Sequence, residues 1–176
     1  MNIASERTKK VLAKVLISLM EERDFPKITI ADVVNKAGIN RKTFYYHFHS
    51  TKELLEWIVN NESIELAKKY DIRLGFDSAI DFVMNYIEKN QEFLRTVEKG
   101  VGDSLVRDFI YNNLYPAIFS QITASHKYSQ EDDIQFLAEF YTEAATGILQ
   151  KWLEKPTLRS RKETTECLKS VLTEEI

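Results

Sequence analysis

The sequence has 176 residues, with 24 Lys and Arg against 27 Asp and Glu and a net charge of −3. Its 44% hydrophobic and 29% charged residues exclude a disordered chain and a membrane bundle. A single cysteine, Cys167, excludes a scaffold of intrachain disulfides. Because no apolar run approaches the roughly 18 residues of a membrane span, we expect no membrane partner and a cytoplasmic location.

Helices are the only element type that the sequence pattern favours. The chain contains 5 Gly and 3 Pro and lacks alternating strand patterns, which predicts an all-α fold. Apolar residues three and four positions apart predict a first helix over about residues 5–22. Thr29 and Asp32 have the spacing of a capping box that begins a second, short helix, and Gly38 suits its end. Asn40 is a good N-cap for a third helix that reaches Phe48.

The rest of the chain contains few segments that would break a helix. A capping box from Ser50 to Glu53 predicts a fourth helix starting at Thr51. Breaks such as Lys99-Gly100-Val101-Gly102 and the sequence around Pro156 divide the rest of the chain. We therefore expect further helices near 77–98, 103–123, 131–154 and 157–173.

Charge is unevenly distributed along the chain. Residues 1–50 contain nine Lys and Arg and five acidic residues, a net charge of +4, and the other 126 residues have a net charge of −7. This asymmetry predicts an N-terminal domain of residues 1–50 that meets an anionic partner and a helical domain of residues 51–176.

Two short helices joined by a turn with Gly are typical of a helix-turn-helix, whose second helix enters the DNA major groove. Phe44 and Phe48 would hold that helix, and the basic and polar groups of its first turn would reach base edges. Hydroxyl, imidazole and ammonium groups that follow would contact phosphates. The candidate DNA-binding residues on this ground are Asn40, Arg41, Lys42, Thr43, Tyr45, Tyr46, His47 and Lys52.

The run from Ile28 to Phe48, followed by Ser50 to Leu55, resembles the DNA-binding domain of TetR/AcrR-type transcriptional regulators. The resemblance covers about residues 8–56. It implies a two-fold dimer in which a three-helix module binds an operator and a larger helical domain dimerises and often binds a small effector. It also implies that Arg41, Lys42 and Thr43 face bases, whereas Thr29, Tyr45 or Tyr46, His47 and Lys52 contact phosphates. Lys42 departs from the small residue of many members and adds a long cation to base readout.

Residues 136–153 are similar to the penultimate helix of a subgroup of these regulators that includes regulators of dihydroxyacetone kinase operons, some of them activators. Ala144 and Gly147 would allow close helix approach, and Phe140, Ile148 and Trp152 would supply apolar area. We expect these five residues to form a homodimer interface.

Several motifs have a simpler reading. The two short helices of the predicted helix-turn-helix could have a purely structural role. His47 and His49 lack acidic or cysteine partners at the spacing of metal ligands, so we expect no metal site. The cluster from Arg159 to Lys162 reads as a solvated helix face, and Cys167 as an apolar contact. The aromatic residues of the second domain could line an effector cavity, but aromatic residues at helical spacing more often form the core, so no effector-binding residue is assigned. They are Phe76, Phe82, Tyr86, Phe93, Phe109, Tyr111, Tyr115 and Phe119.

Taken together, the sequence predicts a homodimeric transcription regulator without a cofactor. We expect a repressor rather than an activator, with operator affinity controlled by a small-molecule effector. The alternative is a co-activator that keeps this fold and acts through another regulator. An enzyme is disfavoured because no catalytic constellation or phosphate-binding loop has a usable spacing.

Overall fold

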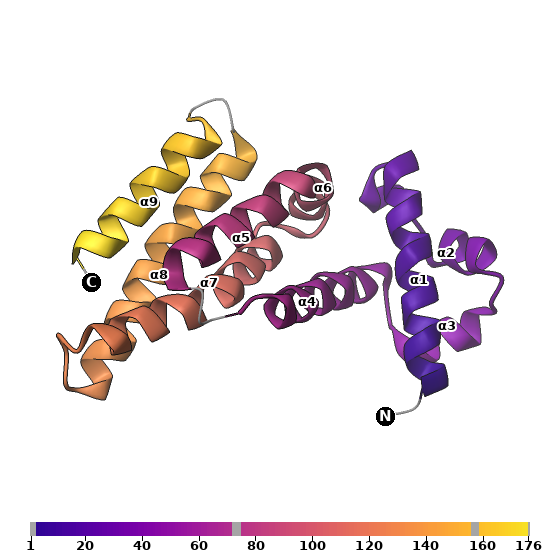
Figure 1. The fold of residues 1–176 in the computed structure, drawn as a ribbon. Coiled ribbons are helices and arrows are strands. Elements are labelled where there is room, and N and C mark those ends of the chain that lie inside the picture. The colour runs from indigo at the N-terminus through magenta and orange to yellow at the C-terminus, as the bar shows by residue number, and fades with distance from the viewer. Residues whose placement is uncertain (1–2, 72–74, 156–158, 176) are drawn as a thin grey trace. The chain divides into compact units, whose positions relative to one another are not determined.

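The structure is a computed structural model that describes residues 3–71, 75–155 and 159–175. Its regular elements within these ranges are all helical, as the sequence predicts. The elements are α1 (Ile3–Glu22), η1 (Phe25–Lys27), α2 (Ile30–Ala37), α3 (Arg41–His47), α4 (Thr51–Lys69), α5 (Gly75–Lys89), α6 (Gln91–Val101), α7 (Ser104–Ser125), α8 (Glu131–Glu154) and α9 (Arg161–Glu175), where η1 is a 3-10 turn (Figure 1).

The chain forms two compact units, and each of them is made of two separate segments of the sequence. The first contains Met1–Glu62 and Thr96–Leu105, and the second contains Ser63–Arg95 and Val106–Ile176. The first unit therefore includes most of α4 and the second half of α6 in addition to α1–α3. Nothing in the sequence pattern assigns residues 96–105 to the N-terminal helices.

The core of the first unit is built from one apolar face of each helix. Leu12 and Leu16 of α1, Val33 of α2, Phe44 of α3 and Leu54 of α4 are all fully buried. The three- and four-residue spacings that predict these helices therefore also identify the residues that pack together. This packing holds α3 by one face and leaves its other face exposed.

The prediction of one helix near 77–98 is wrong, because α5 ends and α6 begins around Asn90. The backbone N–H and the side-chain amide of Asn90 both donate to the Tyr86 carbonyl, at 3.0 and 2.8 Å. The Asn90 carbonyl accepts from the Leu94 N–H at 2.9 Å. An asparagine side chain that bonds to the local backbone competes with helix continuation, which accounts for the break.

The last helix begins at Arg161 and not near residue 157. Ser160 and Glu163 form a capping box: the Glu163 N–H donates to Ser160 Oγ at 3.2 Å, and the Ser160 N–H donates to Glu163 Oε2 at 2.8 Å. This pair fixes the helix start. Residues 156–158, where the expected helix would begin, lie outside the described ranges.

Within the second unit, α9 packs along α5. Lys169 Nζ donates to Asp81 at 2.5 Å, and Arg161 donates to Glu88 and Asn85 at 2.9 and 2.6 Å. The helix α8 has the bounds that the sequence predicts. Phe136, Phe140 and Ile148 of α8 and Val171 of α9 are exposed.

Candidate nucleic-acid interface

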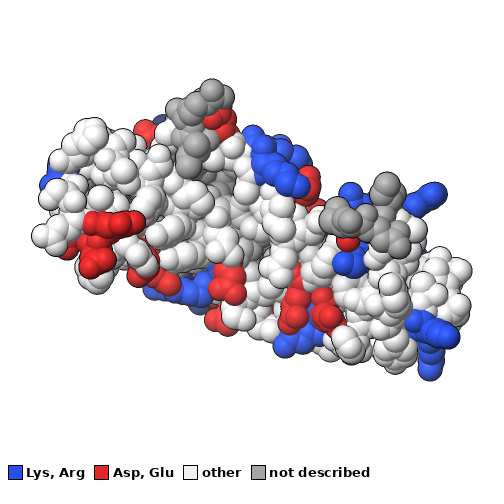
Figure 2. All heavy atoms as spheres, turned by 90° about the horizontal axis from the view of Figure 1, so that it is seen from below, with Lys and Arg blue, Asp and Glu red and all other residues white. Residues whose placement is uncertain are grey.

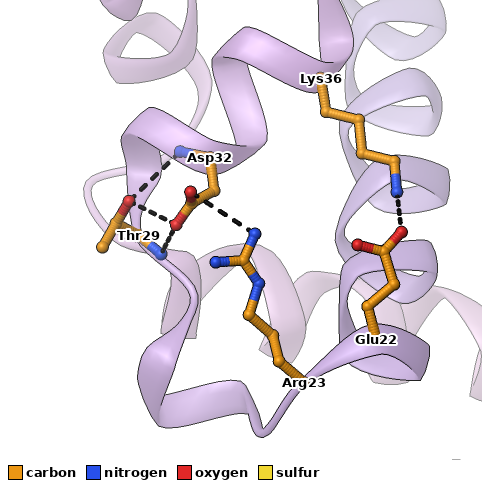
Figure 3. A network of polar contacts seen from close by, with 5 residues as sticks. All are labelled: Glu22, Arg23, Thr29, Asp32 and Lys36. Atoms are coloured by element: carbon orange, nitrogen blue, oxygen red, sulfur yellow. Dashed lines mark hydrogen bonds and ion pairs between the residues drawn. The ribbon is translucent and has the colours of Figure 1, made fainter.

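The short helix α2 is fixed to α1 by two polar anchors. At its N-terminus, Asp32 accepts from the backbone N–H of Thr29 at 2.9 Å and from its hydroxyl at 2.7 Å, and Arg23 approaches the same carboxylate at 3.5 Å. Toward its C-terminus, Lys36 pairs with Glu22 and donates to Ser18 at 3.0 Å. Figure 3 shows that Arg23 and Glu22 reach α2 from the end of α1. The predicted capping box is thus confirmed, and α2 is braced at both ends.

These bonds hold the Asp32 carboxylate in its charged form. The hydroxyl and the backbone N–H of Thr29 lower the pKa of Asp32, and the Arg23 guanidinium adds to the effect. Because the Thr29 hydroxyl donates its only proton to Asp32, that proton is not available to a phosphate oxygen. The free backbone N–H groups of the first turn of α2 remain as donors. In this arrangement Thr29 acts first as the cap that orients α2.

The turn before α3 places its first residues outward. Gly38 has φ of +67°, the left-handed conformation that ends α2, and the Ile39 N–H donates to the Val34 carbonyl at 3.1 Å. Asn40 then caps α3, because its Oδ1 accepts from the Thr43 N–H at 2.8 Å and from the Thr43 hydroxyl at 3.0 Å. The side chains of Asn40 and Thr43 are therefore bonded to each other.

The outer face of α3 presents basic and aromatic side chains to solvent. Arg41 and Lys42 are exposed, and neither forms an ion pair or hydrogen bond with another described residue. Tyr45 and Tyr46 are 52% and 79% exposed. The same arrangement leaves cations and phenol hydroxyls side by side on one helix face, which is the chemistry that base edges and phosphates require.

His47 lies at the C-terminal end of α3, where it is half-buried against α1. Its Nδ1 lies 3.4 Å from Ser5 Oγ. Burial lowers the pKa of His47, and the nearby Lys9 ammonium lowers it further. That ammonium also lies 5.8 Å from the ring centre of Trp57, which packs on Phe48. The imidazole is therefore held neutral at physiological pH and can still donate one hydrogen bond.

The start of α4 differs in one detail from the expected capping box. Ser50 Oγ accepts from the Glu53 N–H at 3.0 Å, as predicted. The Glu53 carboxylate, however, accepts from the backbone N–H of His49 at 2.6 Å and lies 2.9 Å from its Nδ1, so it does not return to Ser50. Lys52 is exposed, with Glu56 as a distant partner at 3.9 Å. Its ammonium group is thus accessible to an anion.

Sequence reasoning missed one contact that supports this surface. Phe25 of η1 is buried, and a Cβ built on Gly100 of α6 would lie 2.6 Å from Phe25 Cδ1. The two residues are 75 positions apart in the chain. Only a residue without a side chain allows α6 to lie this close to the turn that precedes α2. No local pattern signals the contact, since Gly100 reads as a loop residue in the sequence.

The five residues expected at a homodimer interface lie along α8. Phe140 and Ile148 are 58% and 46% exposed, and Ala144 is exposed beside them. A Cβ at Gly147 would meet no atom within 4 Å. Trp152 is instead buried within the protomer, where its indole N–H donates to the Arg159 carbonyl at 3.2 Å.

The first unit presents several basic side chains on its surface. In Figure 2 the right-hand end, which α1–α3 build, shows separate basic side chains and few acidic ones. Among the described residues, no group of three His, Cys, Asp or Glu side chains could hold a metal ion. No described helix is both long and apolar enough to cross a bilayer.

Comparison with protein families gives two matches that cover most of the chain. Residues 14–58 match the family described as bacterial regulatory proteins of the tetR family, and residues 76–174 match a transcriptional regulator C-terminal region. The first match contains α2 and α3, and the second contains α8.

Among curated proteins, the chain is 31% identical over 90 residues to the HTH-type dhaKLM operon transcriptional activator DhaS of Lactococcus lactis, which covers 51% of this chain and 48% of DhaS. It is 27% identical over 137 residues to the HTH-type transcriptional regulator EthR of Mycolicibacterium smegmatis, covering 77% of this chain and 51% of EthR. The matches therefore span about half the length of these relatives.

Solved structures show the same fold. The structure of the dihydroxyacetone kinase operon activator DhaS has a TM-score of 0.72 at 24% identity over 96% of both chains. A TetR transcriptional regulator from Streptococcus agalactiae has a TM-score of 0.67 at 22% identity, over 96% of this chain and 95% of that one. With its N-terminal and C-terminal regions both matched, the chain belongs to the TetR family of bacterial transcriptional regulators.

Proposed function

We propose that the chain binds a two-fold symmetric DNA operator as a homodimer, with α3 of each copy in the major groove. The observation that carries this proposal is the outer face of α3, where Arg41 and Lys42 have no hydrogen-bond or ion-pair partner among the described residues and Tyr45 and Tyr46 are exposed. The buried Phe44 and the braced α2 hold that face in place. Arg and Lys at the start of such a helix can donate to guanine O6 and N7.

Fluorescence anisotropy with labelled DNA from the regions flanking the gene tests this proposal. The unaltered chain should bind at least one fragment with an affinity that falls steeply as salt rises. Lys42→Ala and Tyr46→Ala should each weaken binding, while Lys162→Ala, which removes an exposed lysine of α9, should not. Salt-insensitive binding, or equal binding by all three variants, would contradict the proposal.

Homodimerisation is proposed to use the exposed face of α8. Phe140, Ala144 and Ile148 form an exposed apolar stripe on α8, and a homodimer with two-fold symmetry would present one α3 helix to each half-site of a symmetric operator. Sedimentation velocity tests it directly. We expect a dimer for the unaltered chain and a shift to monomer for Ile148→Asp, which places a charge in the middle of the stripe.

Control by a small-molecule effector is proposed for the second unit. Its interior contains the fully buried Thr142 and Thr146 on α8, and the Thr146 hydroxyl has no hydrogen-bond partner among the described residues. A buried unpaired hydroxyl costs roughly 1–3 kcal/mol, which a ligand with a polar group could recover. A metabolite that raises the melting temperature of the unaltered chain should lose this effect with Thr146→Val, which keeps the side-chain shape. A panel of candidate metabolites that stabilises both proteins equally would contradict the role of Thr146.

The protein could regulate its target genes by repression or by activation, and one experiment distinguishes the two. Repression is the proposal, in which the dimer blocks a promoter and an effector releases it. Activation, directly or through another regulator, is favoured by the similarity to a relative whose name is that of an operon transcriptional activator. Deletion of the gene should raise the transcripts of its targets if it is a repressor and lower them if it is an activator.

A further inference from the structure

Two histidines near the end of α3 have different hydrogen-bond partners. Nδ1 of His47 lies 3.4 Å from Ser5 Oγ of α1, whereas Nδ1 of His49 lies 2.9 Å from Glu53 Oε2 of α4. A neutral imidazole carries its proton on one nitrogen only, and the hydrogen bond of one nitrogen decides which of the two carries it. The two partners therefore determine which nitrogen of each ring can donate to a further group.

The partner of His49 fixes the proton of that ring on Nδ1. The His49 backbone N–H and the ring both lower the pKa of Glu53, so this carboxylate is ionised. An ionised carboxylate only accepts hydrogen bonds, and Nδ1 must donate to it. Nε2 of the neutral ring then has a lone pair and cannot donate to a phosphate oxygen. Neutral His49 is therefore unsuited to a phosphate contact, although 89% of its side chain is exposed.

The partner of His47 allows the opposite proton position. The Ser5 hydroxyl can donate as well as accept, and it forms no other hydrogen bond with a described residue. The charged groups that face His47 are Lys9 and Glu6 of α1, which pair at 3.3 Å. Burial and Lys9 lower the pKa of His47, and Glu6 raises it less. Because the ring is neutral, Nε2 carries the proton only if Nδ1 accepts.

We propose that Ser5 is a positioning residue for DNA binding: its hydroxyl donates to Nδ1 of His47, and this bond places the ring proton on Nε2, which donates to a phosphate oxygen. The inference rests on the proposed operator binding. A phosphate oxygen only accepts, so a neutral ring that binds it must present Nε2–H and must find a donor for Nδ1. Ser5 supplies that donor from the first helix, 42 positions away in the chain. It acts through the ring and needs no contact with DNA.

Long-range proton–nitrogen NMR spectra of the two rings test the proton positions in the full chain. In mildly alkaline solution, His47 should have the Nε2–H form and His49 the Nδ1–H form. Ser5→Thr, which keeps the hydroxyl, should leave both rings unchanged. Ser5→Ala should give a mixture of the two forms at His47 and leave His49 unchanged. The Nδ1–H form at His47 in the unaltered chain, or no change with Ser5→Ala, would overturn the proposal.

DNA affinity gives a second readout, measured by fluorescence anisotropy. Ser5→Ala should weaken binding about threefold to tenfold, the effect of one hydrogen bond, and equally on preferred and altered sequences. The salt dependence should stay the same, because a neutral ring releases no counterion. Ser5→Thr should bind like the unaltered chain. The matched control is Thr8→Ala, which removes a hydroxyl that donates to the Ala4 carbonyl of the same helix at 3.0 Å and should leave DNA affinity unchanged.

A double-mutant cycle with His47 distinguishes positioning from a direct contact. His47→Gln provides an amide whose N–H donors do not depend on a ring proton. In this background Ser5→Ala should leave DNA affinity unchanged. An equal loss in both backgrounds would overturn the proposal, because Ser5 would then bind DNA itself or support the fold. Circular dichroism checks that each variant is folded.

The outcomes separate the role of Ser5 from operator binding. If Ser5→Ala binds DNA like the unaltered chain while Lys42→Ala still weakens binding, the role of Ser5 is overturned and operator binding stands. An unaltered chain that binds no DNA at any salt concentration overturns both.

Discussion

The backbone of Gly100 lies so close to the ring of Phe25 that a methyl group at position 100 would be 2.6 Å from Phe25 Cδ1. Phe25 precedes α2, and Gly100 lies in the part of α6 that belongs to the same compact unit. The contact therefore ties α6 to the turn that leads into the helix-turn-helix.

This contact predicts that even the methyl side chain of alanine at position 100 lowers the stability of the protein. Gly100→Ala should lower the free energy of unfolding by about 1–3 kcal/mol, as overpacking of a close-packed site does, although alanine is a better helix former than glycine. In a Phe25→Leu background the same substitution should cost less, because the smaller side chain leaves room. A double-mutant cycle of chemical denaturation measures the difference. Equal effects in both backgrounds would show that the two residues do not contact.

The main role that we predict for Thr29 is to cap the N-terminus of α2. Thr29→Ala removes the hydroxyl that accepts from the Asp32 N–H and donates to its carboxylate, and should cost about 1 kcal/mol of stability. Thr29→Ser keeps the hydroxyl and should stay near the unaltered chain in both stability and DNA affinity. Thermal denaturation and anisotropy on the same samples check both effects. A loss of DNA affinity with Thr29→Ser as large as with Thr29→Ala would contradict the capping role.

His47 is predicted to titrate below its ordinary pKa of 6.5. Since the folded pKa is the lower one, the unfolded chain takes up the proton first as the pH falls. The contribution of His47 to stability is therefore complete above pH 6.5 and is lost as the pH falls through the folded pKa. Ring chemical shifts in an NMR titration should show this, and Lys9→Ala should raise the pKa of His47 part of the way back. A pKa above 6.5 in the folded protein would contradict the structure.

Lys42 and Lys52 should affect DNA binding in different ways. Lys42→Ala should cost about 1–3 kcal/mol on the preferred sequence and relax the preference at one base pair. Lys52→Ala should weaken binding almost equally on all sequences and reduce the salt slope by about 1. Titrations on matched preferred and altered DNA at several salt concentrations separate the two. Identical profiles for both variants would show that Lys42 does not read bases.

The sequence reveals local features of the fold well because caps and turns depend on near neighbours. The bond between Thr29 and Asp32, the left-handed Gly38 and the Asn40 cap each involve residues at most four positions apart. The basic face of α3 is predictable for the same reason, since a helix periodicity and two buried aromatic positions fix which side is exposed. These features account for most of the candidate site.

Contacts between distant segments are not visible in the same way. The sequence shows a break around Lys99 to Gly102, yet only Gly102, with φ of +94°, has a conformation that favours glycine there, whereas Gly100 lies within α6. Its role depends on Phe25, which arrives from another part of the chain. The approach of Ser5 to His47, 42 residues away, depends on tertiary packing too. Such contacts are set by how helices pack, which a single sequence does not encode locally.

The central claim is that two copies of α3 read one operator, and selection of DNA by the full chain from a random library tests it most directly. We predict an enriched sequence with two-fold symmetry, whose half-site centres are about 34–36 Å apart or a multiple of the helical repeat. Lys42→Ala should change or blur the preference within each half-site. An enriched sequence without two-fold symmetry, or no enrichment at any salt concentration, would contradict the account.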